Sequence, residues 1–233
     1  MRGTFRGPSG RELGPRDLTI LELLFRIGSI TREEVPVTLS GGSVSHFYAR
    51  LRKELGKDPP VSLMLGEYLA DFVRKLPTLC GPQYNLIGIP NAGRPLAQAA
   101  SLADASRRPF TPVICFTDMR SELKEGHGVD GSMWAGIPEL DHYTYCTVEN
   151  ASTTGKEVDR SLRRLEGDGF PTRTGMHHIV IFNRGGVEML GQSGYEHVHG
   201  VFDLHDAIAA YANFELLPRT HLEEYREEIG WAA

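Results

Sequence analysis

Residues 144–158 read TYCTVENASTTGKEV and place an acidic residue, small hydroxylated residues and one glycine between two periodic stretches. The apolar residues before Glu149 are typical of a buried strand, and the pattern from Gly155 to Gly167 is typical of a helix. A helix that begins directly after a strand has unpaired backbone N–H groups at the positive end of its dipole, which suit a phosphate. The stretch therefore predicts a phosphate-friendly turn in an α/β protein.

This turn also carries groups that suit a sugar. Gly155 lets the backbone approach a ligand closely, and the hydroxyl donors beside it are Ser152, Thr153 and Thr154. Glu149 is badly placed to hold a phosphate but well placed to accept hydrogen bonds from sugar hydroxyls. A sugar phosphate uses both kinds of group. The alternative is an ordinary capped helix with surface hydroxyls.

The second half of the chain alternates short apolar runs with helical patterns. The expected strands are 85–89, 112–116, 143–148, 178–182 and a possible fifth at 196–201, and the expected helices are 95–105, 155–167 and 203–211. A long loop rich in glycine and charge runs from Thr117 to about Leu140. Apolar strands that alternate with helices imply a parallel sheet buried on both faces. Ligands of such a sheet bind beyond the carboxyl ends of its strands.

The first 80 residues have a different character. Residues 1–16 mix arginine with glycine and proline, which predicts a flexible leader, with a nucleic-acid arm as the alternative. A helix is expected from Asp17, as N-cap, to about Gly28, followed by a hairpin-like segment over 37–52 and an amphipathic helix over 63–76. An acidic amphipathic helix over 221–231 caps the domain or meets another subunit. We expect residues 17–233 to form a single domain.

Composition limits the class of protein. The 233 residues include 40% hydrophobic residues and carry a net charge of -5, which argues against a protein that binds nucleic acid over its whole surface. The three cysteines, Cys80, Cys115 and Cys146, lack CxxC spacing and are expected to be reduced thiols. No apolar stretch approaches the ~20 residues of a membrane span, and the N-terminus lacks a signal segment. The sequence predicts a soluble, cytoplasmic protein without a membrane partner.

Five segments together resemble one family. Residues 148–155, VENASTTG, resemble the diphosphate-sugar signature of the type I phosphoribosyltransferases. Four further segments stand in that family's order and resemble its orotate phosphoribosyltransferase branch: SHFYARLR at 45–52, GIPNAGRPLA at 88–97, RSELKEGHG at 120–128 and FNRGG at 182–186. The resemblance runs from about residue 18 to about residue 212.

The resemblance implies a fold and a reaction. The fold is a type I phosphoribosyltransferase-like α/β core over about 81–212, a parallel sheet flanked by helices, with an N-terminal hood over about 17–80 and a C-terminal helix over about 219–230. The reaction transfers 5-phosphoribose from phosphoribosyl diphosphate to orotate and gives orotidine monophosphate and diphosphate in pyrimidine (UMP) synthesis. The implied Mg²⁺ is carried by phosphoribosyl diphosphate, and the implied partners are these small molecules and a second copy in a homodimer.

The resemblance also assigns residues. The long loop would act as a lid whose catalytic residues are Arg120, Lys124 and His127, delivered to the leaving diphosphate. The substrate-binding residues would be Glu149, Asn150, Ala151, Ser152, Thr153, Thr154, Gly155, Lys156, Glu157, Arg184, Phe47, Tyr48, Asn91 and Ala92. A solvated loop is the alternative for the lid.

Arg184 indicates the acceptor. A guanidinium at a strand end can pair in bidentate fashion with a carboxylate, which orotate has and the common purine bases lack. The alternative is a salt bridge to Glu188 or another nearby acid. Phe47 and Tyr48 would pack against the flat base, with a place in the core as their alternative.

Some positions depart from the family pattern. Asn150 stands where an acid is usual, and expected lysines align with Ser40, Ala92 and Ser121. Each lost charge-assisted contact is worth ~1.5–3 kcal/mol unless another cation compensates, for which the candidates are Arg94 and Lys156. Two alternatives therefore stay open: transfer to another nucleobase, and a non-catalytic regulator that binds a nucleotide or phosphoribosyl diphosphate.

Histidines raise the question of a metal site. His177 and His178 precede or begin a strand, and His197 and His199 alternate on one face of another. Cysteine or paired acidic ligands at recognised spacing do not accompany them, so we expect no protein-held metal.

Overall fold

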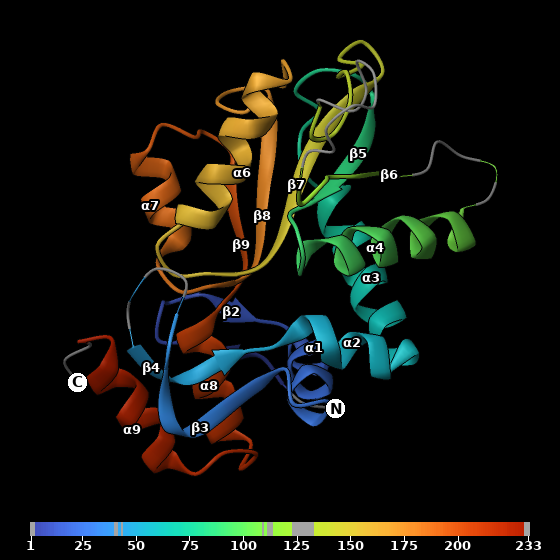
Figure 1. Ribbon diagram of the computed structural model, residues 1–233. Helices are drawn as coiled ribbons and strands as arrows, with labels where there is room; N and C mark the ends of the chain where they lie inside the picture. Colours follow the sequence, from blue (N-terminus) through green and yellow to red (C-terminus); the bar gives the residue numbers. More distant parts are fainter. Residues whose placement is uncertain are drawn as a thin grey trace.

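The computed structural model describes residues 3–39, 42, 44–108, 110, 114–122 and 133–230. The largest sheet within these residues has five parallel strands in the order β6-β5-β7-β8-β9 (Figure 1). In chain order the strands are β5 (Gln83–Gly88), β6 (Cys115–Asp118), β7 (Tyr143–Ser152), β8 (Met176–Asn183) and β9 (Val198–Asp203). The α/β class and all five expected strands are confirmed.

The strand order fixes where a ligand can bind. From β5 the chain moves to β6 on one side and then returns to β7 on the other side, so the direction reverses between β5 and β7. Ligands of doubly wound sheets bind at such a switch point, outside the carboxyl ends of the strands. Gly88 pairs with Val148 in the sheet, so the segments that follow them, 89–92 and 149–155, begin side by side.

Helices cover both faces of the sheet. The helices α3 (Pro59–Val73) and α4 (Gly93–Arg107) lie on one side, and α6 (Lys156–Gly167) and α7 (Gly186–Gln192) lie on the other (Figure 1). Successive strand residues serve the two layers: Leu86 belongs to the buried cluster that includes α3 and α4, and Ile87 belongs to the cluster that includes α6. Burial on both faces explains the continuous apolar runs of the sequence.

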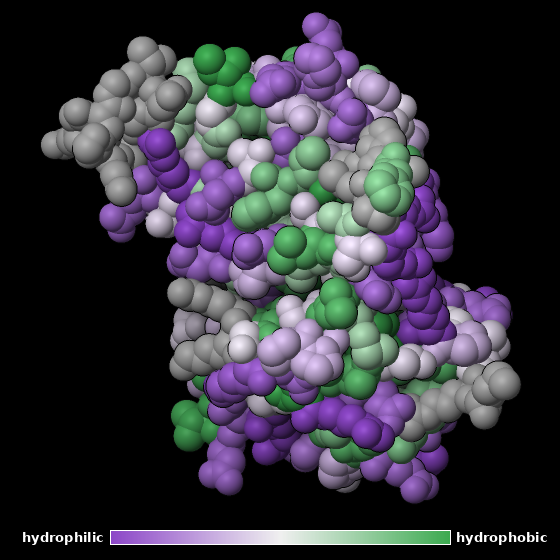
Figure 2. All heavy atoms as spheres, turned by 90° about the vertical axis from the view of Figure 1, so that its right-hand side faces the viewer, coloured by the Kyte–Doolittle hydropathy of each residue, from purple (hydrophilic) through white to green (hydrophobic). Residues whose placement is uncertain are grey.

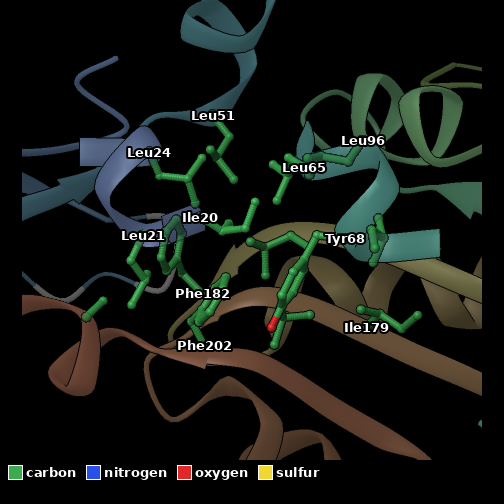
Figure 3. Packing of buried hydrophobic residues seen from close by; sticks show 14 of the residues in the cluster. Ile20, Leu21, Leu24, Leu51, Leu65, Tyr68, Leu96, Ile179, Phe182 and Phe202 are labelled. Carbon is green, nitrogen blue, oxygen red and sulfur yellow. The ribbon is translucent and has the colours of Figure 1, made fainter. Parts of the chain in front are cut away.

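The remaining elements gather at one end of the sheet (Figure 1). They are β1 (Phe5–Arg6), β2 (Glu12–Leu13), α1 (Pro15–Arg26), β3 (Ile30–Thr38), β4 (Val44–Ala49), α2 (Leu51–Lys57), α8 (Leu204–Asn213) and α9 (Arg219–Glu228). Ile20 and Leu24 of α1 join Phe182 of β8 and Phe202 of β9 in one buried cluster (Figure 3). Tyr68 of α3 stacks on Phe202 with 5.5 Å between ring centroids. The N-terminal segment, from β1 to α2, therefore shares its core with the sheet.

The structure differs from the flexible leader expected over residues 1–16. The strands β1 and β2 pair in antiparallel fashion, and Leu13 is buried. The Ser9 backbone N–H and hydroxyl both donate to Asp206 of α8, at 2.9 and 2.5 Å, and Arg11 donates to the Val201 carbonyl at 2.6 Å. This segment is docked by partners almost 200 positions away. Local composition does not reveal such partners.

Several helix boundaries also differ from expectation. Asp17 is the third residue of α1 rather than its N-cap, which is Gly14, and the Gly14 N–H donates to the Asp17 carboxylate at 2.9 Å. The helix expected over 63–76 begins earlier, at Pro59. The helices α2 and α7 were not expected, because each has 7 residues, too few to show a clear period.

The face formed by α3 and α4 is partly apolar. Figure 2 shows hydrophobic residues gathered over the middle of this side of the molecule, between hydrophilic ones. Leu63 and Met64 of α3 and Leu102 of α4 are exposed large hydrophobic residues. Among the described residues, the helices are too short or too polar to cross a membrane.

Candidate functional site

The turn after β7 has the geometry of an anion site. Gly155 is the N-cap of α6 and has φ +69°, a conformation that favours glycine. The Asp159 N–H donates to the Gly155 carbonyl at 2.7 Å. No side chain within the described residues caps the helix, so the first N–H groups of α6 remain open to a ligand. Thr153 and Thr154 are half-buried beside these groups.

The other residues of the turn divide into exposed and buried. Lys156 and Glu157 are exposed, and Glu157 pairs with Arg160 at 3.1 Å. Ala151 is half-buried, whereas Ser152 is buried against the start of α7. A Cβ at Gly186 would lie 2.1 Å from Ser152 Oγ, so the Ser152 hydroxyl faces α7. The threonines are thus better placed than Ser152 to donate to a ligand.

Glu149 is a buried carboxyl group at the end of β7. Only 9% of the residue is exposed, and the Asn150 N–H donates to Glu149 Oε1 at 2.6 Å. Burial raises the pKa of Glu149 to about 8, and the negative charge of Glu157 acts in the same direction. Glu149 therefore keeps its proton at neutral pH. A protonated carboxyl group offers a sugar hydroxyl both a donor and an acceptor.

Asn150 links β7 to the N-terminal segment. Its Nδ2 donates to the Ala49 carbonyl of β4 at 3.5 Å, a long hydrogen bond. Its Oδ1 is buried and has no hydrogen-bond partner among the described residues. An unpaired buried acceptor is costly, so a ligand hydroxyl that donated to Asn150 Oδ1 would be stabilised.

The segment after β5 lies against the same strand end. A Cβ at Gly93 would lie 1.9 Å from the Val148 carbonyl oxygen, so only glycine lets α4 begin so close to β7. The Ile89 N–H donates to that same oxygen at 2.9 Å. Asn91 is exposed and Ala92, the N-cap of α4, is half-buried. Two helices, α4 and α6, therefore present their N-termini at the switch point.

Arg94 is not free to take the place of a missing lysine, because its guanidinium already has partners. Its Nε lies 2.7 Å from Asp118 Oδ1, and the guanidinium also donates to the Met119 carbonyl. These contacts hold Arg94 at the end of β6. Lys156 is exposed, and it is the better placed of the two compensating cations that the sequence suggests.

Both ends of the long loop after β6 are attached to the core. The Arg120 N–H donates to the Trp134 carbonyl at 2.8 Å, and the Trp134 N–H donates to Asp168 Oδ2 at 2.7 Å. Arg164 lies over the Trp134 ring, 4.0 Å from its centroid. Arg120 Nη1 is buried without a hydrogen-bond partner in the described part of the chain, so it is available to an anion. The other two predicted loop residues, Lys124 and His127, lie outside the described residues.

Arg184 follows β8 and reaches the N-terminal segment. Its backbone N–H donates to the Ser152 carbonyl at 2.9 Å, which ties it to the end of β7. Its Nη1 donates to the Phe47 carbonyl at 3.0 Å and its Nη2 to Ser45 Oγ at 2.8 Å. Its ion-pair partner is Glu228 of α9, at 3.3 Å. The acid with which Arg184 pairs is therefore Glu228, and Glu188 instead accepts from Asn183 at 3.1 Å.

Comparisons with known proteins give matches among solved structures. No family model and no curated protein matches the chain. UMP synthase from Leishmania donovani superposes with a TM-score of 0.70 at 16% identity, over 92% of this chain and 42% of that one. Orotate phosphoribosyltransferase from Francisella tularensis gives 0.59 at 17% identity, over 90% and 98% of the two chains. The Mycobacterium tuberculosis enzyme, in complex with inorganic phosphate, gives 0.53 at 22% identity, over 83% and 99%. This chain has the orotate phosphoribosyltransferase fold.

The fold that the five sequence motifs predict is thus confirmed. In this phosphoribosyltransferase fold the segments 88–93 and 149–156 meet at the switch point, as their positions after neighbouring strands require. The chain spans 42% of the Leishmania donovani UMP synthase chain and nearly the full length of the two orotate phosphoribosyltransferases.

The two aromatic residues expected at the base lie differently in the phosphoribosyltransferase fold. Phe47 is 1% exposed and packs edge-on against Tyr225 with 5.2 Å between centroids, which favours the core alternative. Tyr48 is exposed, and Arg50 lies over its ring at 5.4 Å. Only Tyr48 has a ring surface open to a ligand.

The histidines of β8 and β9 contact one another and neighbouring polar groups. His178 is fully buried between Thr147 Oγ1, at 3.0 Å, and the Thr172 carbonyl, at 2.6 Å, and burial lowers its pKa to about 4. His177 Nδ1 lies 3.0 Å from His199 Nε2. Within the described residues, no group of three or more potential ligands is arranged to hold a metal ion.

Sequence reasoning missed Ser45 and Glu228 as site residues. Both contact Arg184. Glu228 stands 44 positions further along the chain, in a helix with several glutamates that the sequence alone does not distinguish. Ser45 belongs to the quoted segment at 45–52, which was the only available signal.

Proposed function

We propose that this protein transfers 5-phosphoribose from phosphoribosyl diphosphate to orotate. One observation carries the proposal: the N-termini of α4 and α6 begin beside each other at the switch point, and the polar residues Glu149 and Asn150 lie at the end of the strand between them. Two anion sites flanking a hydroxyl-binding site match a ribose with phosphate groups at both ends. The orotate phosphoribosyltransferase fold supports the same reading.

The donor would occupy these segments in a defined order. The first turn of α6, with Thr153, Thr154 and Lys156, would hold the 5-phosphate, while Glu149 and Asn150 would bind the ribose hydroxyls. The segment from Gly88 to Ala92 would hold the diphosphate, together with the Mg²⁺ that the donor carries.

In the reaction, a ring nitrogen of orotate attacks the anomeric carbon of the ribose. The bond from that carbon to the diphosphate oxygen breaks, and its electron pair leaves with the diphosphate. Positive charge develops on the ribose and negative charge on the leaving group, so the site must supply cations and exclude water. Arg120, with its buried unpaired Nη1, would face the leaving diphosphate with Lys124 and His127 of the same loop.

Arg184 would select the acceptor by pairing with the orotate carboxylate. Another base remains an alternative acceptor, which a carboxylate-binding arginine disfavours. A binding protein without turnover is favoured by one specific observation. Arg94 is already paired with Asp118, so the cations missing at Ser40, Ala92 and Ser121 are not simply replaced by it.

The proposal is tested by following orotate consumption in the presence of phosphoribosyl diphosphate and Mg²⁺. We expect wild-type turnover, a large rise in the orotate KM for Arg184→Ala, and a loss of kcat for Lys124→Ala. Saturable nucleotide binding without orotate consumption would favour the regulator instead. An unchanged orotate KM in Arg184→Ala would contradict the acceptor assignment.

Assembly and location are further parts of the proposal. The resemblance implies a homodimer, and the exposed apolar residues of α3 and α4 offer one face that a second copy could cover. Sedimentation equilibrium would show a dimer mass if this is correct. A cytoplasmic location remains a prediction.

A further inference from the structure

The last residue of α9 places a carboxylate among three converging donors. Glu228 Oε2 accepts from Ser45 Oγ at 2.6 Å and from Arg184 Nη2 at 3.3 Å, and Glu228 Oε1 accepts from the His46 N–H at 2.8 Å. We call these donors, Ser45 Oγ, Arg184 Nη2 and the His46 N–H, the carboxylate cradle. The cradle satisfies both oxygens of one carboxylate.

The cradle is largely buried, and further contacts hold its arginine in place. The side chains of Arg184 and Glu228 are 11% and 16% exposed. Arg184 is fixed from other directions by the Phe47 carbonyl and by the Tyr225 ring, whose centroid lies 5.2 Å away. Charge-assisted hydrogen bonds in such a place are strong, so the cradle is suited to a planar anion.

The cradle also lies beside the proposed reaction site. The Arg184 backbone bonds to the Ser152 carbonyl, and Asn150 bonds to Ala49, the last residue of the strand that supplies Ser45 and His46. A carboxylate-bearing acceptor held by Arg184 would therefore need the position that Glu228 now occupies. Two carboxylates placed together repel each other, so both do not fit at neutral pH.

We propose that Glu228 is a tethered competitor that occupies the position of the acceptor carboxylate and thereby sets acceptor affinity. The inference rests on the proposed function, in which Arg184 binds that carboxylate. An acceptor with a carboxylate binds only after Glu228 leaves the cradle. Its apparent affinity is therefore its intrinsic affinity multiplied by the fraction of molecules in which the cradle is free. An acceptor without a carboxylate does not gain when Glu228 is removed.

Contacts other than those of Glu228 hold the rest of α9. Glu224 pairs with Arg32 of β3 at 2.7 Å, and Tyr225 is buried against Phe47. Glu228 is the final residue of the helix, so release of the last turn frees the cradle while Glu224 and Tyr225 keep α9 docked. This arrangement supplies a matched control, because Glu224 is a second α9 carboxylate paired with an arginine of the N-terminal segment.

The test measures binding of orotate and of uracil, which is the same ring without the carboxylate, by calorimetry. The proteins are wild type, Glu228→Gln, Glu228→Ala and the control Glu224→Gln. We expect both Glu228 variants to bind orotate at least about fivefold more tightly than wild type does, with uracil binding unchanged. Glu224→Gln should bind both ligands as wild type does.

Steady-state kinetics supply a second readout. The Glu228 variants should lower the orotate KM by a similar factor and leave the phosphoribosyl diphosphate KM within about twofold of wild type. An orotate affinity that is unchanged, weaker or undetectable in the Glu228 variants would overturn the inference, as would an equal gain for uracil.

The two proposals can fail separately. Tighter orotate binding in the Glu228 variants without any turnover would support the inference and contradict the proposed function. Turnover with an unchanged orotate KM in these variants would support the function and overturn the inference.

Discussion

At the residue scale, Glu149 shows how folding prepares a polar site. The fold buries the Glu149 carboxyl group at a strand end and raises its pKa to about 8. The unfolded chain loses this proton near pH 4.5, whereas the folded protein keeps it until about pH 8. Between these values the folded state binds more protons, so the contribution of Glu149 to stability falls as pH rises. Ligand binding at Glu149 would offset this loss of stability.

Glu149→Gln should remove this pH dependence. At pH 8 the variant should exceed wild type in free energy of unfolding by on the order of a few kcal/mol, because glutamine has no proton to lose. The advantage should shrink towards pH 5. Urea unfolding at both pH values measures it, with Glu223→Gln, an exposed carboxylate of α9, as control. A constant difference between wild type and Glu149→Gln across this range would contradict the buried state of Glu149.

Single residues also show what the sequence can predict. Gly155 and Glu149 were predictable, because the turn that uses them is local and a strand and a helix flank it. The partner of Arg184 was not predictable, since tertiary packing rather than spacing brings Glu228 to it. The core position of Phe47 depends on Tyr225 in the same way.

At the element scale, the site depends on how closely α4 approaches β7. The N-terminus of α4 reaches the switch point only because Gly93 has no Cβ to strike the Val148 carbonyl, which would lie 1.9 Å away. The contact aligns the start of α4 with the end of the strand that carries Glu149. This close approach of the two backbones depends on α4 and β7 together.

Gly93→Ala should therefore separate α4 from β7. We expect a loss of about 1–3 kcal/mol in the free energy of unfolding, since the backbone must shift to admit a methyl group. Weaker binding of phosphoribosyl diphosphate should accompany the loss. Gly167→Ala, at a helical glycine with open space around its Cβ position, is the control and should not destabilise. Equal stability of Gly93→Ala and wild type in chemical denaturation would contradict this packing.

Elements with a clear period were predicted best. The central strands β5, β7 and β8 are almost wholly buried because both faces of the sheet are covered. The helices α4, α6 and α8 follow strands in the expected order. The short helices α2 and α7 contain too few turns for a period. Lys124 and His127 of the proposed lid lie outside the described residues, so their roles stay predictions.

At the scale of the whole molecule, the N-terminal segment closes the end of the sheet that holds the site. Ser9 and Arg11 attach its first strands to α8 and β9, while α9 attaches β3 and β4 through Glu224 and Glu228. Contacts between the two ends of the chain therefore position β4, whose carbonyls bind Asn150 and Arg184. The composition of residues 1–16 gave no sign of this docking.

Ser9→Ala should loosen that closure. The substitution removes a hydroxyl donor from the buried Asp206 carboxylate and should cost about 1–3 kcal/mol of unfolding free energy. Thermal unfolding measures the effect against Ser106→Ala, whose exposed hydroxyl donates to the Ala103 carbonyl of its own helix. Matching melting temperatures for the two variants would indicate a free N-terminal leader.

Product analysis tests whether the whole molecule transfers phosphoribose to orotate. The purified protein is incubated with orotate, phosphoribosyl diphosphate and Mg²⁺, and the products are quantified by chromatography with mass detection. We expect orotidine monophosphate and diphosphate in equal amounts, formed only when both substrates are present. Saturable binding of phosphoribosyl diphosphate with neither product formed would contradict it.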